Sequence, residues 1–304
     1  MRHRRLRALS LALTAALTAP PAMAGAVLDY VGTYIWSRDE ASFGGFSGLE
    51  IGPDGRSFHA LTDRAHLYWG RIERDDRGIV RGMAVAGRAN LRDSKGQPLP
   101  PGYTGDSEGL AIGPDGRIHV SFEGLNRVAA YDGPDAPATP LPSLPKLPGI
   151  GTNSGLEALA VADDGTLIAI PERSGAEERP FPVLRFDGAW SEHARIRRDP
   201  RWLVVGADFG PDGWLYVLER DFRGILGFAS RVRRMQLTPG VVQQDEILLE
   251  TRPLQYDNLE GIAVWDDGIG IRLTMISDDN FLFVQRTEIV EYRLREDRAS
   301  AMRN

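Results

Sequence analysis

Residues Ser107–Gly124 read SEGLAIGPDGRIHVSFEG, and four other stretches of the chain repeat this pattern. The other copies begin at Phe46, Gly155, Val205 and Asn258, so the pattern returns after roughly 50 to 60 residues. Each copy consists of an apolar run, a tight turn and a second run of near-alternating polarity. Proline, aspartate and glycine favour the backbone angles of such a turn, and the runs beside it predict a β-hairpin. The aspartates of these turns are therefore expected to have a structural role.

Further strand-like segments follow the hairpins and enlarge the repeating unit. A third strand is predicted at Arg127–Tyr131 and at Arg231–Met235, and a fourth at Val241–Glu250. Four strands in a unit of about 50 residues are typical of a β-propeller blade. We therefore predict an all-β chain that folds as a five-bladed propeller. A degenerate sixth blade, in the long gap between Arg64 and Asp106, remains an alternative.

The two ends of the repeat region predict how the ring closes. The last copy is followed by one further strand at Thr287–Tyr292, and it lacks an outer strand. The segment Leu28–Trp36 has strand character but no hairpin partner, so we expect it to complete the last blade and remove the free edges. Residues 25–304 are then one propeller domain. The proline-rich stretch Pro134–Pro148 falls between two copies and is predicted to be an inter-blade loop.

Residues 1–24 have the organisation of a cleavable signal peptide. A basic region with four arginines precedes a short apolar run at Leu6–Leu17, and Ala22-Met23-Ala24 is a small-residue cleavage site. The apolar run is too short to span a bilayer as a helix. We expect the mature chain to be periplasmic or secreted, without membrane insertion after cleavage.

The composition excludes several classes of function. The chain has no cysteine, which excludes disulfides, thiolate nucleophiles and cysteine-based metal sites. Without the four arginines of residues 1–24, the 36 basic residues become 32 against 42 acidic ones, a net charge near −10. This charge disfavours nucleic acid and anionic membranes as partners. It is compatible with a cation, or with a substrate bound through a cation.

Acidic residues recur at two equivalent places in the repeats. The start of the first strand carries, in chain order, Ser47, Glu108, Glu157, Val205 and Glu260. The second strand ends at Asp63, Glu123, Glu172, Glu219 and Asp278, and further acids nearby are Glu50, Asp106, Asp208 and Asp257. Since hairpin strands are antiparallel, both sets belong to one end of the blade, at the mouth of the channel opposite the turns. Up to eight crowded carboxylates would raise one another's pKa values, and a bound cation would relieve that repulsion.

These positions lead to a hypothesis for the site. Ligands with oxygen donors only, in a flexible ring, favour Ca²⁺. The predicted metal ligands are Glu108, Glu157, Glu260 and Asp278. The predicted catalytic base is one of Glu123 and Glu172, and the predicted substrate-binding residues are Arg64, Arg173 or Arg220. These arginines could instead form ion pairs that tie neighbouring blades together.

Several of these segments resemble a known family. Ser107–Ala111, Pro171-Glu172-Arg173, Leu218-Glu219-Arg220 and, above all, Ile276–Phe281 with Gln285-Arg286-Thr287 are similar to the phytase-like (esterase-like activity of phytase) family of exported bacterial proteins. The resemblance covers nearly all of residues 28–294. It implies a β-propeller and a phosphoesterase or esterase activity. The chain lacks the dense basic lining that phytate would need, so a smaller phosphoester or carboxylic ester fits better.

Three functions are consistent with these observations. The first is an exported metal-dependent hydrolase of phosphoesters or small esters, acting at the channel mouth with a small anionic or ester substrate. The second is a calcium-dependent lactonase-type propeller. The third is a binding or scaffold propeller that calcium stabilises and that turns over no substrate.

Overall fold

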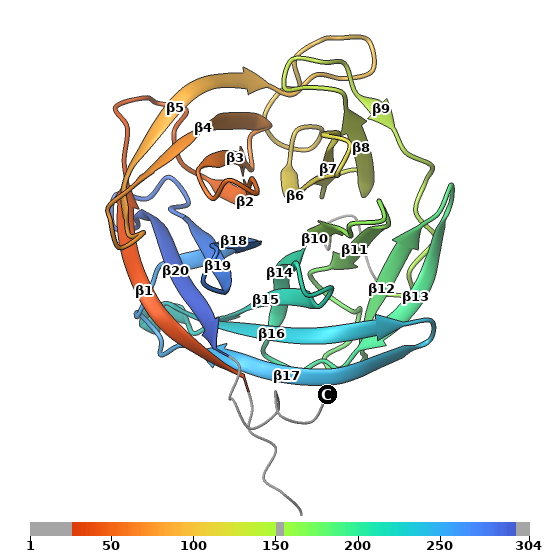
Figure 1. Cartoon of the computed structure of the whole chain (residues 1–304). Coiled ribbons are helices and arrows are strands. Elements are labelled where there is room, and N and C mark those ends of the chain that lie inside the picture. The colour runs from red at the N-terminus through yellow and green to blue at the C-terminus, as the bar shows by residue number, and fades with distance from the viewer. Residues whose placement is uncertain (1–25, 150–154, 296–304) are drawn as a thin grey trace, which may run out of the picture.

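The computed structural model describes residues 26–149 and 155–295, which form five four-stranded antiparallel sheets around a central axis (Figure 1). The prediction of a five-bladed propeller is thereby confirmed. The predicted signal peptide, residues 1–24, lies outside the described residues. Within the described part of the chain, no helix is long and apolar enough to cross a membrane.

Blades 1 to 4 are meanders that run from the axis to the outer edge, whereas blade 5 takes its outer strand from the N-terminal segment. Blade 1 comprises β2 (Phe46–Ile51), β3 (Ser57–Thr62), β4 (His66–Arg74) and β5 (Val80–Asn90). Blade 2 comprises β6 (Ser107–Ile112), β7 (Ile118–Phe122), β8 (Arg127–Tyr131) and β9 (Thr139–Pro140). Blade 3 comprises β10 (Leu156–Val161), β11 (Leu167–Pro171), β12 (Phe181–Phe186) and β13 (Trp190–Ile196).

The last two blades are the most extended. Blade 4 comprises β14 (Leu203–Phe209), β15 (Leu215–Phe222), β16 (Phe228–Thr238) and β17 (Val241–Glu250), with the short 3₁₀ helix η1 (Gly224–Leu226) before β16. Blade 5 comprises β18 (Asn258–Asp266), β19 (Ile271–Asp278), β20 (Thr287–Arg295) and β1 (Val27–Trp36).

Two expectations for the connecting segments differ from the structure. The gap between Arg64 and Asp106 holds β4, β5 and a loop closed by the Arg92–Pro98 bridge, so there is no sixth blade in it. The predicted inter-blade loop Pro134–Pro148 contains β9, which pairs with β8 and supplies the outer strand of blade 2. Proline has no backbone N–H to donate, but on an edge strand one side of the backbone faces solvent, so Pro140 can still take part in this short pairing.

The turn aspartates have the structural role that the sequence predicts. Asp54 accepts hydrogen bonds from the backbone amides of Arg56 and Ser57, at 2.9 and 2.7 Å. Asp115, Asp164 and Asp212 each accept one from the amide two residues later. The bond from the Ser57 amide is the largest of the interactions that hold the pKa of Asp54 below its usual value. These turns fix the register of the inner hairpins.

The pairing within each inner hairpin is interrupted by a register shift near the start of the first strand. The inner strands pack closely because one position at this shift holds a small residue in every blade. This position holds Gly48, Gly109, Ala158, Gly206 and Gly261. A Cβ on Gly206 would lie 2.5 Å from the carbonyl oxygen of Glu260 in the next blade. A Cβ on Gly261 would lie 2.9 Å from the backbone nitrogen of Leu49. Glycine therefore permits the close approach of backbones that keeps the channel narrow.

The pairing of β1 with β20 closes the ring, as predicted. The register runs from Val27 opposite Arg295 to Trp36 opposite Thr287. At its end the Trp36 ring stacks on Phe46 of blade 1, with the ring centroids 4.9 Å apart. The apolar core between blades 5 and 1 therefore contains residues from both ends of the domain.

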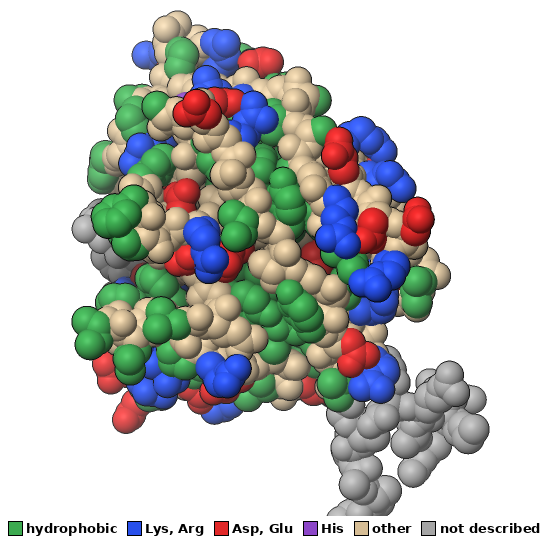
Figure 2. Space-filling model, turned by 90° about the vertical axis from the view of Figure 1, so that its left-hand side faces the viewer, with side chains coloured by type: hydrophobic (Ala, Val, Ile, Leu, Met, Phe, Trp, Pro, Cys, Tyr) green, Lys and Arg blue, Asp and Glu red, His purple; other side chains and the backbone are tan. Residues whose placement is uncertain are grey.

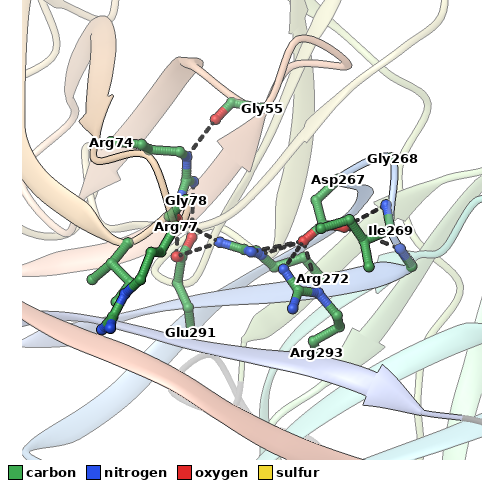
Figure 3. A network of polar contacts seen from close by, with 12 residues as sticks. Gly55, Arg74, Arg77, Gly78, Asp267, Gly268, Ile269, Arg272, Glu291 and Arg293 are labelled. Atoms are coloured by element: carbon green, nitrogen blue, oxygen red, sulfur yellow. Dashed lines mark hydrogen bonds and ion pairs between the residues drawn. The ribbon is translucent and has the colours of Figure 1, made fainter.

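A buried ionic network joins the same two blades (Figure 3). Glu291 of β20 accepts bonds from Arg74 of blade 1 at 2.8 Å and from Arg272 at 3.1 Å. Arg272 also donates to the carbonyl of Gly78 at 2.7 Å and pairs with Asp267. Figure 2 views the molecule from this side, where basic and acidic side chains lie among hydrophobic ones. Buried charges that are fully paired hold the seam in one arrangement.

Candidate functional site

A cavity of about 590 Å³ opens at the end of the channel opposite the aspartate turns. Its described lining includes eight acids and two arginines. The acids are Asp63, Asp106, Glu108, Glu123, Glu157, Glu172, Glu260 and Asp278, and the arginines are Arg173 and Arg220. The structure therefore brings together all four predicted metal ligands, both predicted bases and two of the three predicted arginines. We call this cavity the acidic mouth.

A β-bulge in each inner hairpin places one set of these acids. The register of the first strand shifts at Ser47, Glu108, Glu157, Val205 and Glu260 in the five blades. A bulge leaves one residue without a partner and turns its side chain away from the ladder. Three of the five bulged residues are glutamates, and all three line the acidic mouth.

The ends of the second strands place the other set. The amides of Asp63, Glu123 and Glu172 each donate to a carbonyl just before the first strand of the same blade. Asp278 is the last residue of β19 and pairs with Asn258. These residues are at the same height as the bulges because the strands of each hairpin are antiparallel.

Blade 4 departs from this pattern, and the predicted position of Glu219 at the mouth is wrong. Glu219 pairs with Val204 inside the ladder and is fully buried, 2.6 Å from Arg231 and 2.8 Å from Arg233. The residue that reaches the mouth is Arg220, one position later. Successive side chains in a strand face opposite sides, so a shift of one residue exchanges acid for base.

Arg220 serves as a cation within the ring of acids. Its guanidinium donates to Glu172 at 3.0 Å, to the Asn258 side chain at 3.2 Å and to Glu260. It therefore joins blades 3, 4 and 5, and protein acceptors already engage it. Of the predicted metal ligands, Glu260 is the one held by Arg220 and by Asn258.

The acids of blade 2 form the tightest cluster. Ligand oxygens of Asp106, Glu108 and Glu123 all lie within 4.8 Å of one another. Burial raises the pKa of Glu108 well above its usual value, and the charges of Glu157 and Glu260 raise it further. Burial likewise raises the pKa of Asp106 and of Glu123. An oxygen-only cluster with this electrostatic cost is suited to a hard cation.

A second pair of acids lies on the blade 5 and blade 1 side of the mouth. Burial raises the pKa of Asp63 to about 7 and that of Asp278 to about 8, and the charge of Glu260 raises both. The Oδ1 atom of Asp63 is buried and has no hydrogen-bond partner among the described residues. The pKa values of these two carboxyls thus lie close to neutral pH.

The remaining predicted residues have different environments. Arg173 lines the mouth, lies 2.9 Å from Glu172 and keeps half of its side chain exposed. Arg64 does not line the cavity; its guanidinium lies 3.3 Å from the ring centroid of Phe281. The half-exposed Arg173 is therefore the arginine best placed to meet a ligand.

Of the four nearby acids noted in the sequence, only Asp106 lines the mouth. Glu50 and Asp208 lie three residues beyond the bulges and accept bonds from the amides of Ile112 and Val264. Asp257 binds the side chain of Gln285 and the amide of Arg286. Asp106 directly precedes the second copy of the repeat, and this position is the sequence feature that places it beside Glu108.

Comparison with known proteins extends these observations. The model of a family described as "Phytase-like: Esterase-like activity of phytase" matches residues 41–281. A search of curated protein sequences found no match.

Several solved structures with similar folds are distant from this chain in sequence. The PQQ-bound aldose sugar dehydrogenase from Streptomyces coelicolor is 15% identical over 91% of this chain and 100% of that chain, with a TM-score of 0.53. A putative gluconolactonase is 15% identical over 90% of this chain and 94% of that chain, with a TM-score of 0.47. A gluconolactonase from Xanthomonas campestris is 15% identical over 82% and 72% of the two chains, with a TM-score of 0.43. At such identities the likeness concerns the fold alone.

Proposed function

Because the chain belongs to the phytase-like family, described by the esterase-like activity of phytase, we propose that it is a cation-dependent hydrolase of ester bonds. Its site is the acidic mouth, and its substrates are small phosphoesters or carboxylic esters. The observation that carries this proposal is the cluster of Asp106, Glu108 and Glu123 in the wall of an open cavity.

The donor set fits a hard divalent cation. Carboxylate oxygens are the ligands that Ca²⁺ prefers, and it accepts the irregular arrangement that bulged strands provide. We assign the cation to Asp106, Glu108 and Glu123. Glu157 is the neighbouring charge that raises the pKa of Glu108 most. When bound, it would polarise the ester oxygen and offset the charge that develops in the transition state.

The other residues of the mouth would orient the substrate and handle protons. The half-exposed guanidinium of Arg173 would bind an anionic oxygen of the substrate. Asp63, with a pKa of about 7, would accept a proton from water, and Asp278, with a pKa of about 8, would donate one to the leaving alcohol. The ester bond is thereby hydrolysed by one water molecule. The enzyme returns to its initial state when Asp63 passes its proton to Asp278.

A neutral cyclic ester is the second candidate substrate. Eight acids but only one half-exposed arginine line the described part of the mouth, because Arg220 is held by Glu172 and Glu260. A polyanion finds few partners in such a cavity, whereas a lactone needs no basic lining. Lactonase activity is therefore proposed beside phosphoester and ester hydrolysis.

The proposal is tested with residues 25–304 and three chromogenic or pH-detected substrates: p-nitrophenyl phosphate, p-nitrophenyl acetate and a sugar lactone. We expect turnover of at least one substrate with Ca²⁺ and none with EDTA. Glu108→Gln should lower kcat/KM on the order of a hundredfold, as the loss of a direct cation ligand predicts. Glu50→Gln, which removes a channel carboxylate outside the mouth, is the matched control.

Two outcomes would decide against hydrolysis at this site. Equal turnover in EDTA, or full activity in Glu108→Gln, would move catalysis away from the cluster. A rise in melting temperature with Ca²⁺, with no turnover of any of the three substrates, would favour the scaffold function instead.

A further inference from the structure

Three neighbouring connections on the mouth face of blades 4 and 5 expose large apolar side chains. They are residues 222–227, from the last residue of β15 up to β16, residues 252–257 between β17 and β18, and residues 279–286 between β19 and β20. Their apolar side chains, each at least half exposed, are Phe222, Ile225, Leu226, Leu254, Leu282, Phe283 and Val284. Ile225 and Phe283 are 99% exposed. We call these three connections the apolar rim.

The three connections form one continuous surface. The side chain of Leu254 approaches Gly227 so closely that a Cβ there would lie 2.5 Å from its Cδ2 atom. Asp257 accepts hydrogen bonds from the side chain of Gln285 and the amide of Arg286, at 3.1 and 2.9 Å. Residues 252–257 therefore link the two outer connections. Monomeric soluble proteins rarely expose so many large apolar side chains together without a binding role.

Basic and acidic side chains of the rim lie at different depths. Arg286 and Arg252 of the rim are exposed, and so is Arg201, which lies 3.7 Å from Asp221 beside the rim. Arg223 is the exception, since about a third of its side chain is exposed and it pairs with Asp221. The acids that pair with them lie beneath, since Asp221 and Glu288 are buried. The outermost layer is thus apolar and basic, although the whole chain is acidic.

From this arrangement we propose that the apolar rim docks the propeller onto a lipid bilayer that contains anionic headgroups. The side chains of Ile225 and Phe283 enter the boundary between headgroups and acyl chains, and the arginines bind the lipid phosphates. Side chains that project from loop ends with 99% exposure suit insertion into a fluid interface. An apolar groove for a folded partner would instead keep such side chains partly covered.

Docking in this orientation involves the acidic mouth directly. Arg220 lines the mouth and Phe222 belongs to the rim; in the same way, Asn280 lines the mouth and Leu282 belongs to the rim. The wall of the mouth on blades 4 and 5 therefore continues into the docking surface. Residues on the opposite face, at the turns between the inner strands, point away from the bilayer.

The experiment is vesicle flotation of residues 25–304, the part of the chain that holds all five blades. Vesicles of phosphatidylglycerol with phosphatidylethanolamine are compared with vesicles of phosphatidylcholine alone. We expect the wild type to float with the anionic vesicles. Ile225→Ser/Phe283→Ser should lower the partition coefficient at least tenfold, on the order expected when two fully exposed apolar side chains are lost. Arg201→Gln/Arg252→Gln should remove the preference for the anionic composition.

A matched control loses apolar surface on the opposite face. Ile269 and Val241 lie at hairpin turns there and are more than half exposed, so Ile269→Ser/Val241→Ser should float like the wild type. The fluorescence of Phe283→Trp should shift to shorter wavelength when anionic vesicles are added. These readouts need no turnover, so they are independent of the proposed hydrolase activity.

The following results would overturn the proposal. The wild type could remain unbound with both vesicle types, or Ile225→Ser/Phe283→Ser could float as the wild type does. Self-association of the wild type that this variant abolishes, without any flotation, would assign the rim to a second copy of the chain.

Discussion

Arg220 shows how one side chain sets the electrostatics of the acidic mouth. It occupies the place where the other four blades carry an acid, and it binds Glu172 and Glu260. Two positions of the ring are thus neutralised within the protein. Among the described residues, no arginine forms an ion pair with Asp106, Glu108 or Glu123 in blade 2, and only the charge of Arg173 acts on Glu123. This cluster is therefore the part of the ring that a bound cation would relieve most.

Replacing Arg220 with Met tests this role. We expect the free energy of unfolding at neutral pH to fall by about 3 kcal/mol, because buried carboxylates lose their partner. The loss should shrink at low pH, where protonated acids need no cation. Urea unfolding measures both. Arg64→Gln, at an arginine more exposed and stacked on Phe281, should change stability by less than about 1 kcal/mol.

The carboxyls of Asp63 and Asp278 predict an unusual pH dependence. Their pKa values are about 7 and about 8 in the folded protein, above the value of about 3.9 for an unfolded aspartate. The folded state thus binds more protons than the unfolded state across this range, so stability falls as pH rises from about 4 to about 8. Melting temperatures in EDTA should decrease over this window. The slope should weaken in Asp63→Asn/Asp278→Asn, and a flat or rising profile in the wild type would contradict the assignment.

At the level of single residues, the sequence predicted part of the site. Glu108, Glu157 and Glu260 could be found because the repeat aligned them at one position, which the structure shows to be a bulge. Glu219 was misplaced because blade 4 reaches the mouth one residue later, and strand alternation hides such a shift. Which acids Arg220 binds depends on side chains from three blades, and no repeat pattern contains that information.

At the level of elements, the strands were more predictable than the connections. The third strand of blade 2 and the fourth strand of blade 4 have the predicted bounds, because their polarity patterns are unambiguous. The two-residue strand β9 was missed, since it contains a proline and pairs through a short stretch of backbone. The bulges could not be predicted from polarity alone, although they aim the acids.

The small residues after the bulges link packing to the site. Gly206→Ala would bring a Cβ within 2.5 Å of the carbonyl oxygen of Glu260, which is backbone and cannot turn aside. We expect a loss of about 1 to 3 kcal/mol and a weaker calcium response, because the inner strand of blade 5 must move. Gly133→Ala adds a Cβ with no atom within 4 Å and should leave both unchanged. Thermal unfolding with and without Ca²⁺ compares the two variants.

The ionic network at the closing seam should contribute to stability but not to the site. In Glu291→Gln the buried guanidiniums of Arg74 and Arg272 lose a charged partner, so stability should fall by about 3 kcal/mol. Calcium binding, measured by calorimetry on the folded variant, should stay as in the wild type. Glu40→Gln removes a partly exposed pair with Arg38 and should have an effect below about 1 kcal/mol. A weakened calcium affinity in Glu291→Gln would contradict this separation.

For the whole molecule, a cation that binds only the folded state must raise its stability. At one hundred times the dissociation constant the gain is about 2.7 kcal/mol. We therefore expect the melting temperature of residues 25–304 to rise when Ca²⁺ replaces EDTA, and to rise more at pH 8 than at pH 6, because protons compete for the same carboxylates. Glu108→Gln should lose most of this response. An equal response in the variant would exclude the blade 2 cluster as the binding site.

The pairing of β1 with β20 has a consequence for how the chain is assembled in time. Of the strands that the structure describes, β1 is the first in the chain and pairs with β20, the last, so nearly the whole domain must be synthesised between them. Such a long-range contact slows folding. Until it forms, β1 is an unattached strand and blade 5 presents a bare edge, two surfaces that can equally well meet on different molecules. Molecules in which this pairing has not yet formed should therefore associate by exchanging β1. The yield of monomer should then fall as the protein concentration during refolding is raised.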